Sequence, residues 1–273
     1  MALRERVPGV TVIGVARRPE SALAAQERGV VDQASTDLAD VASAEVVVLA
    51  CPLHVTRTVL QDMRAHLAEG AVVTDVGSVK GAVLEQMAAC LDFQRNPFIG
   101  GHPMAGKEVA GVEHAEASLF EGRPWIFTPN QEEIEAVGAL ADWIATPTLI
   151  GARPVLHMRP DSHDRYVALI SHLPFLLSSA FLVAAGRDRS WSEAEQLASS
   201  GFKDVTRLGA GDPAMYAAIV EANREHVLDT WAALHAALDE FEAAIAREGH
   251  DALLQLFQAA RDTRNDWEAT AAH

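Results

Sequence analysis

The sequence predicts a doubly wound α/β sheet followed by an all-helical domain, and three observations lead to this prediction. The first half alternates short apolar runs with amphipathic segments, as parallel sheets covered by helices do. Past Pro160 only long helical patterns remain. With 273 residues, 49% of them hydrophobic, the chain can form two cores. We expect an α/β domain over residues 1–157 and a helical domain over residues 158–273.

Five short apolar runs in the first half are predicted strands. They cover residues 10–16, 44–51, 71–77, 97–101 and 124–129. The segments 20–29 and 54–70 between them are predicted helices that end at Gly29 and Gly70, because glycine favours the left-handed conformation of a helix C-cap.

The helical half contains one strongly apolar run and one regular apolar seam. The run at 169–186 includes His172 and Pro174 and is short for a bilayer span, so we interpret it as a buried core helix. A helix beginning near Asp212 carries apolar residues in a 4-3-4-3-4 spacing, at Val227, Trp231, Leu234, Leu238, Phe241 and Ile245. This seam packs either inside its own domain or against a second subunit.

Composition narrows the classes of partner. The 22 basic and 38 acidic residues give a formal net charge of −16, which repels nucleic acid and anionic lipid surfaces, so we expect neither as a partner. Cys51 and Cys90 suggest no disulfide framework, which predicts a cytoplasmic protein. We predict no metal site.

Chemistry-bearing residues follow the predicted strands, where ligands bind in a doubly wound sheet. Cys51, Pro52 and Leu53 follow the second strand, Asp75 to Gly81 the third, and Gly100 to Glu108 the fourth. Ser78 and His102 therefore lie at the same end of neighbouring strands. A hydrogen bond between them would orient the imidazole and leave its other nitrogen free to take a proton.

Four linked motifs give the sequence a family resemblance. DVGSVKG, IGGHPMAGKEVAGV, DSHDRYVALISHLP and GFKDVTRLGAGDPAMY together resemble prephenate dehydrogenase and its arogenate-using relatives, in order and over nearly the whole chain. The resemblance implies a Rossmann-like nucleotide-binding domain, a helical dimerisation domain, and hence a homodimer. It implies oxidative decarboxylation of prephenate or arogenate in tyrosine biosynthesis, with hydride transfer to NAD or NADP.

The resemblance also assigns roles to individual residues. His102 accepts the proton of the ring hydroxyl and Ser78 hydrogen-bonds with His102. His172 lies at the substrate site, Arg207 binds a substrate carboxylate and Glu108 lies near the entrance. Lys203, one helical turn before Arg207, either assists it or is only a solvated cation. Tyr216 stands where the family often has tryptophan, so substrate packing can differ.

Cofactor contacts are expected at the strand ends, namely at Ala16, Arg17, Arg18, Cys51, Pro52, Leu53, Asp75 and Gly77. NAD-preferring relatives usually carry an acid where this chain has Ala16. The arginines that follow can pair with a 2′-phosphate, which suggests NADP. Alternatively, they are only solvated residues of a loop.

The opening residues 1–20, MALRERVPGVTVIGVARRPE, resemble a segment that in the family follows a first strand and a GxGxxG turn. We expect Met1 to fall inside the first helix, with that strand and turn missing through truncation or a misassigned start. The alternative is a real loss of cofactor binding.

Two other functions compete with this interpretation. A β-hydroxyacid or imine-reducing dehydrogenase can join the same two kinds of domain, but it does not obviously need the GGHP histidine or the TR arginine. The second alternative is a non-catalytic protein that binds a metabolite in the retained substrate pocket.

Overall fold

The computed structural model describes residues 1–106, 111–129, 136–247 and 249–271. The chain divides into two compact units, Met1–Arg224 and Glu225–His273. The boundary predicted from the sequence pattern, at residues 157/158, lies inside the first unit and remains a prediction.

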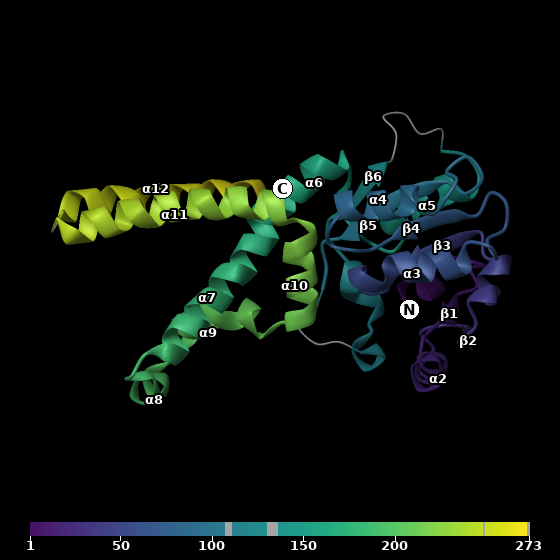
Figure 1. The fold of residues 1–273 in the computed structure, drawn as a ribbon, viewed down its shortest axis with the longest axis horizontal. Helices are drawn as coiled ribbons and strands as arrows, with labels where there is room; N and C mark the ends of the chain where they lie inside the picture. Colours follow the sequence, from purple (N-terminus) through teal and green to yellow (C-terminus); the bar gives the residue numbers. More distant parts are fainter. Residues whose placement is uncertain (107–110, 130–135, 248, 272–273) are drawn as a thin grey trace. The chain divides into compact units, whose positions relative to one another are not determined.

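The first part of unit one is an α/β domain (Figure 1). Its strands are β1 Ile13–Val15, β2 Gln33–Ser35, β3 Val46–Leu49, β4 Val72–Asp75, β5 Phe98–Pro103, β6 Trp125–Pro129 and β7 Val155–His157. Its α-helices are α1 Ala2–Arg6, α2 Pro19–Glu27, α3 Leu53–Met63, α4 Gly81–Ala88 and α5 Ala139–Leu149. Short 3₁₀ helices lie at η1 Leu38–Ser43, η2 Val112–His114 and η3 Ala117–Phe120.

The strands form two sheets in the described part of the chain. β1 and β2 pair in parallel, and the second sheet has the order β3-β4-β5-β6-β7. All five predicted strands exist, whereas β2 and β7 escaped prediction because each has only three residues, which is too short for a clear pattern. The sheet is parallel, as the sequence pattern predicted, except that β5 and β6 pair antiparallel.

Helices cover both faces of the larger sheet, as the doubly wound prediction requires. Alternation along β4 sends Val73 to a cluster with α3 and α4, and Val72 to a second cluster with α1 and α5. Phe98 and Ile99 on β5 divide between the same two clusters. The sheet is thereby buried on both faces, which fixes the register of the strands that carry the candidate site.

Helices form the rest of the chain. They are α6 Pro160–Val167, the π-helical turn η4 Ala168–His172, α7 Leu173–Arg187, α8 Trp191–Ala194, η5 Glu195–Leu197, α9 Ser200–Thr206, η6 Arg207–Ala210, α10 Pro213–Ala222, α11 Arg224–Ala246 and α12 His250–Ala271. The single helix predicted from Asp212 through the seam is two helices, because the backbone leaves the helical conformation at Asn223.

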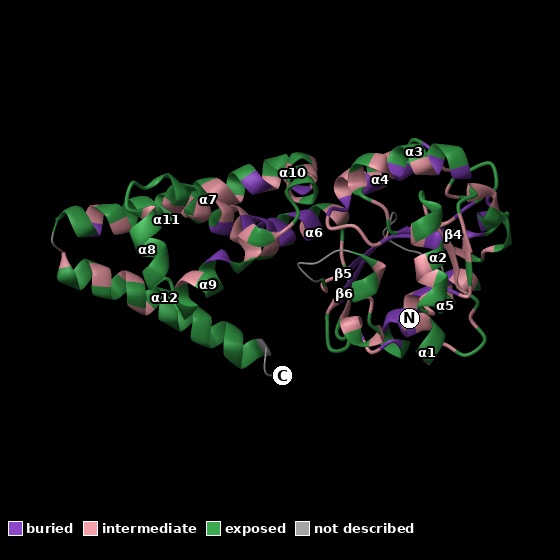
Figure 2. Ribbon diagram, turned by 90° about the horizontal axis from the view of Figure 1, so that it is seen from below, coloured by how far each residue is buried: buried purple, intermediate pink, exposed green. Residues whose placement is uncertain are grey.

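The apolar run at 169–186 differs from its prediction. By length and composition alone Pro160–Arg187 could cross a membrane, a test that core helices of soluble proteins also pass. Only 28% of its most apolar window is buried, with Leu169, Ile170, Leu177, Phe181 and Val183 exposed. The interpretation as a buried core helix is therefore wrong for the single chain. Figure 2 shows the contrast between the buried strands and the largely exposed long helices.

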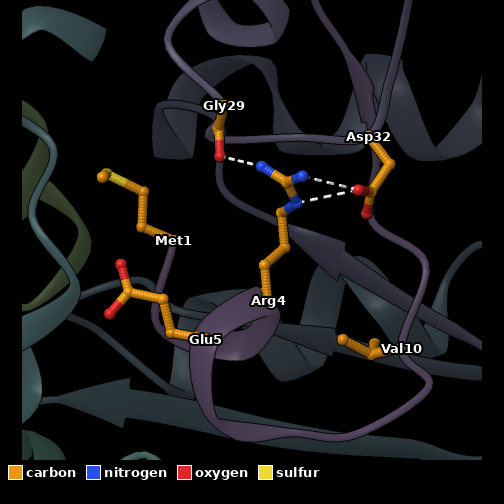
Figure 3. Close-up of a pocket in the computed structure, with 6 residues that line it drawn as sticks. All are labelled: Met1, Arg4, Glu5, Val10, Gly29 and Asp32. Carbon is orange, nitrogen blue, oxygen red and sulfur yellow. Dashed lines mark hydrogen bonds and ion pairs between the residues drawn. The ribbon is translucent and has the colours of Figure 1, made fainter.

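A cavity of about 320 Å³ lies beside α1 (Figure 3). Arg4 crosses it, donating to the carbonyl of Gly29 and pairing with Asp32 at 2.8 Å. Asp32 also accepts the Val12 amide at 2.8 Å. These bonds tie α1 to the β1–β2 sheet, and none of the predicted site residues lines the cavity.

Candidate active site

His102 lies within β5, next to Pro103 at the end of the strand. The backbone of His102 pairs with Ile126 of β6, and only 8% of the residue is exposed. The sequence predicted a loop here, but antiparallel pairing with β6 extends the strand past Gly101. His102 is therefore held by a sheet on a rigid backbone.

A buried hydrogen-bond chain leads away from the His102 ring. Nδ1 of His102 lies 2.8 Å from Nε2 of His163, and Nδ1 of His163 lies 2.7 Å from Oδ1 of Asp164. The two rings meet edge to face, with centroids 5.0 Å apart. The predicted bond between Ser78 and His102 is not the one observed. Only the His-Asp pair inside DSHDRY could have signalled this partner.

Asp164 also fastens α6 to the start of α4. Its carboxylate accepts the backbone N–H groups of Lys80 at 2.7 Å and Gly81 at 2.8 Å. Burial favours the protonated acid, but the hydrogen bonds from His163, Lys80 and Gly81 outweigh it and lower the pKa of Asp164. Asp164 is thus an ionised acceptor.

Lys80 and Asp75 form an ion pair that is almost fully buried. Lys80 Nζ also donates to the carbonyl of Gly101 at 2.7 Å, and Asp75 accepts the amides of Gly77 at 2.8 Å and Gly101 at 3.2 Å. Burial lowers the pKa of Lys80, while Asp75 opposes the shift. The structure thus gives Asp75 and Gly77, both predicted cofactor contacts, a part in holding the turn after β4 against β5.

The surroundings of His102 favour its neutral form. Burial is the largest cause that lowers its pKa well below 6.5, followed by electrostatic interactions with His163, Lys80 and His172 that disfavour a charged His102 ring. At neutral pH the ring is therefore uncharged and able to accept a proton.

A cavity of about 360 Å³ gathers several of the predicted substrate residues. Its lining consists of Ser78, Ile170, Ser171, His172, Phe175, Arg207, Leu208, Met215, Tyr216 and Ile219. His102 and Lys203 are not among the lining residues, and Lys203 is exposed on α9. Glu108 lies outside the described residues.

His172 presents a polar atom with no partner. Its Nδ1 lies 3.1 Å from Nδ2 of Asn223, which also donates to the backbone carbonyl of Asp164 at 2.8 Å. Because an amide nitrogen only donates, Nδ1 is the acceptor and Nε2 carries the proton in the neutral ring. That Nε2 is buried without a hydrogen bond. Burial, reinforced by His163, lowers the pKa of His172 to about 4.

Comparison with known proteins decides the family. The family model described as "Prephenate dehydrogenase, nucleotide-binding domain" matches residues 1–153, and "Prephenate dehydrogenase, dimerization domain" matches residues 159–259. The chain belongs to the prephenate dehydrogenase family. Prephenate dehydrogenase of Bacillus subtilis (strain 168) is 30% identical over 270 residues, which cover 97% of this chain and 71% of the relative.

Solved structures agree with this prephenate dehydrogenase assignment. Prephenate dehydrogenase from A. aeolicus, in complex with hydroxyphenyl propionate and NAD+, is 29% identical with a TM-score of 0.88, covering 97% of this chain and 92% of that one. Synechocystis arogenate dehydrogenase is 32% identical with a TM-score of 0.81, covering 97% and 94%. These matches confirm the Rossmann-like sheet and helical dimerisation domain. The similarity to 3-hydroxyisobutyrate dehydrogenase, at 14% identity and a TM-score of 0.53, concerns the fold alone.

Tyr216 has a defined place in this family member. Its ring stacks on Phe175 with centroids 3.9 Å apart and planes 2° from parallel, and its hydroxyl donates to the Leu208 carbonyl at 2.9 Å. These contacts hold an aromatic wall beside the cavity.

The residues at the strand ends fit part of a dinucleotide. Arg17 and Arg18 are exposed after β1, preceded by the uncharged Ala16, which suits a 2′-phosphate by charge. Cys51, Pro52 and Leu53 connect β3 to α3. The sequence contains no GxGxxG motif for the pyrophosphate.

Proposed function

We propose that this member of the prephenate dehydrogenase family catalyses oxidative decarboxylation of prephenate to 4-hydroxyphenylpyruvate with NAD(P)+ as hydride acceptor. Arogenate is the alternative substrate, since the Synechocystis relative is an arogenate dehydrogenase. The observation that carries the proposal is the buried, neutral His102 on β5, in a chain whose SHLP and TR motifs place His172 and Arg207 on one cavity.

The reaction needs one base and two carboxylate-binding positions. Prephenate is a dicarboxylate with a 4-hydroxycyclohexadiene ring, and the nicotinamide, when bound, takes the hydride from C4. His102 accepts the hydroxyl proton as the C4 carbonyl forms. The bond from C1 to its carboxylate then breaks and carbon dioxide leaves. The electron pair makes the ring aromatic, and the phenolate oxygen recovers the proton.

Cavity residues bind and orient the substrate in this proposal. Arg207 binds a carboxylate through its planar guanidinium, with Lys203 adding positive charge from the preceding turn. The buried Nε2–H of His172 donates to a substrate oxygen, which gives this orphaned group its partner. Ser78 and Tyr216 line the cavity beside the ring. Glu108 belongs to the entrance.

For the cofactor, we propose that Arg17 and Arg18 bind the 2′-phosphate of NADP, while Ala16 leaves out the acid that would favour NAD. We assign the floor beneath it to residues after two other strands, which are Cys51, Pro52 and Leu53 after β3, and Asp75 and Gly77 at the end of β4. We further propose a cytoplasmic homodimer, because both cysteines are free and the helical region matches a dimerization domain.

A direct assay tests these proposals. The chain is given prephenate or arogenate with NAD+ or NADP+, and NAD(P)H formation is followed by absorbance. Turnover of either substrate supports the function, and a higher kcat/KM with NADP+ supports the role of the arginines. Strong NAD preference contradicts that role. Binding of prephenate without turnover, measured by calorimetry, would instead support the metabolite-binding alternative.

A further inference from the structure

We propose that His163 and Asp164 act as positioning residues that hold His102 with its Nε2 unprotonated and take up the charge when that atom accepts a proton. This inference rests on the proposed function, in which His102 is the base. The three residues form a continuous hydrogen-bonded chain, and each bond fixes the state of the next ring.

The donor in each of these hydrogen bonds follows from the ionised Asp164 at one end of the series. Asp164 can only accept, because it already accepts two backbone N–H groups and its carboxyl is ionised. Nδ1 of His163 therefore carries the proton in the 2.7 Å bond. In the uncharged ring Nε2 of His163 then accepts, so the 2.8 Å bond is donated by Nδ1 of His102. A neutral His102 with a protonated Nδ1 has its lone pair on Nε2.

Burial makes this arrangement stable. His163 is fully buried and Asp164 is 5% exposed, so water does not compete for these hydrogen bonds. The titratable groups that act on His102 are Lys80 before α4, His172 on η4 and His163 on α6. Lys80 is paired with Asp75. Asp164 is therefore the carboxylate at the end of the hydrogen-bonded series that begins at His102.

The same chain can carry a proton. When Nε2 of His102 takes the hydroxyl proton, the bond from Nδ1 of His102 can shift its proton to Nε2 of His163. The positive charge then lies on His163, hydrogen-bonded to the Asp164 carboxylate. The proton returns by the reverse path when the phenolate forms, so no proton is gained or lost.

Two substitutions of His163 separate positioning from simple packing. His163→Leu removes the acceptor for His102, and we expect kcat to fall about 10²-fold, as for loss of general base catalysis, with KM within about threefold. His163→Gln places an amide oxygen that can accept the bond but cannot take the proton, so kcat should recover to about tenfold below the wild type. His66→Gln, at an exposed position outside the site, is the matched control.

Nitrogen-15 NMR of the histidine rings, without substrate or cofactor, gives a readout that does not depend on activity. At neutral pH the wild-type His102 should be protonated at Nδ1 and unprotonated at Nε2, and His163→Leu should give a mixture of tautomers. A wild-type ring protonated at Nε2, or a folded His163→Leu variant with unchanged kcat, overturns the proposal. If wild-type protein turns over neither substrate, the proposed function fails, and the NMR result still decides the orientation of His102.

Discussion

At the scale of single residues, the sequence identifies the groups that face the candidate cavity better than those that stand behind them. Ser78, His172, Arg207 and Tyr216 lie in recognisable motifs and converge on one cavity. His163 and Asn223 were missed because their hydrogen bonds join residues 61 and 51 positions apart along the chain. Such pairings are set by how α6 and α10 pack, which no local pattern encodes.

Replacement of His102 is expected to remove the base and little else. We expect His102→Asn to lower kcat/KM by roughly 10² to 10⁴, because a positioned general base contributes about this much. Steady-state kinetics with the preferred substrate checks this, and His66→Gln serves as the control. Activity near the wild-type value would remove His102 from the mechanism.

The buried His172 should make stability depend on pH. Its pKa is about 4 in the folded protein against an ordinary 6.5, so the unfolded state binds a proton first as pH falls. The stabilisation is complete above about pH 6.5 and is lost progressively toward pH 4, at up to about 1.4 kcal/mol per unit. His102, also shifted downward, acts in the same direction.

Denaturant unfolding at several pH values between 4 and 7 measures this dependence. In His172→Gln the free energy of unfolding should change less steeply with pH than in the wild type. His66→Gln should retain the wild-type slope. Equal slopes in all three proteins would contradict a depressed pKa at His172.

At the scale of elements, the predicted strands are correct where burial enforces a regular pattern. β4 to β6 combine apolar residues with buried positions on both faces, and β3 is apolar throughout although only one of its faces is buried, which makes all four visible as apolar runs. The antiparallel pairing of β6 with β5 was not predictable, because side-chain alternation is the same for either strand direction. The break at Asn223 was missed because the apolar pattern continues through it, while its amide is committed to Asp164 and His172.

The turn from β4 to α4 should depend on its buried ion pair. We expect Lys80→Met to lower the free energy of unfolding by about 3–5 kcal/mol, because Asp75 is left charged and buried without its partner. Thermal and denaturant unfolding measure the loss. Lys203→Met, which removes an exposed lysine, should change stability by less than about 0.5 kcal/mol. Equal effects of the two substitutions would argue against the pair as a structural element.

At the scale of the whole molecule, the seam on α11 bears on assembly. Leu238 and Ile245 remain 49% and 64% exposed, so the single chain covers the seam only in part, with Val227 buried and Phe241 against Phe257 of α12 at a centroid distance of 5.4 Å. Uncovered apolar side chains in a region that matches a dimerization domain favour the intersubunit interpretation.

Charged substitutions in the seam should separate the proposed dimer. We expect the double variant Leu238→Lys and Ile245→Lys to sediment as a monomer at micromolar concentration, because two ammonium groups would be desolvated in the interface. Ala236→Lys, on the exposed opposite side of α11, should leave the wild-type mass unchanged. A double variant that keeps a dimeric mass would place the interface elsewhere.

The contact between Asp164 and the start of α4 makes basicity a property of the assembled chain. His102 belongs to the stretch that matches the nucleotide-binding domain, and His163 and Asp164 belong to the stretch that matches the dimerization domain. In our proposal, neither stretch alone contains an oriented base. A separated N-terminal portion would keep His102, the proposed base, but lose His163, the hydrogen-bond partner proposed to fix which ring nitrogen is protonated. The rate of proton transfer would then indicate whether the two portions have docked.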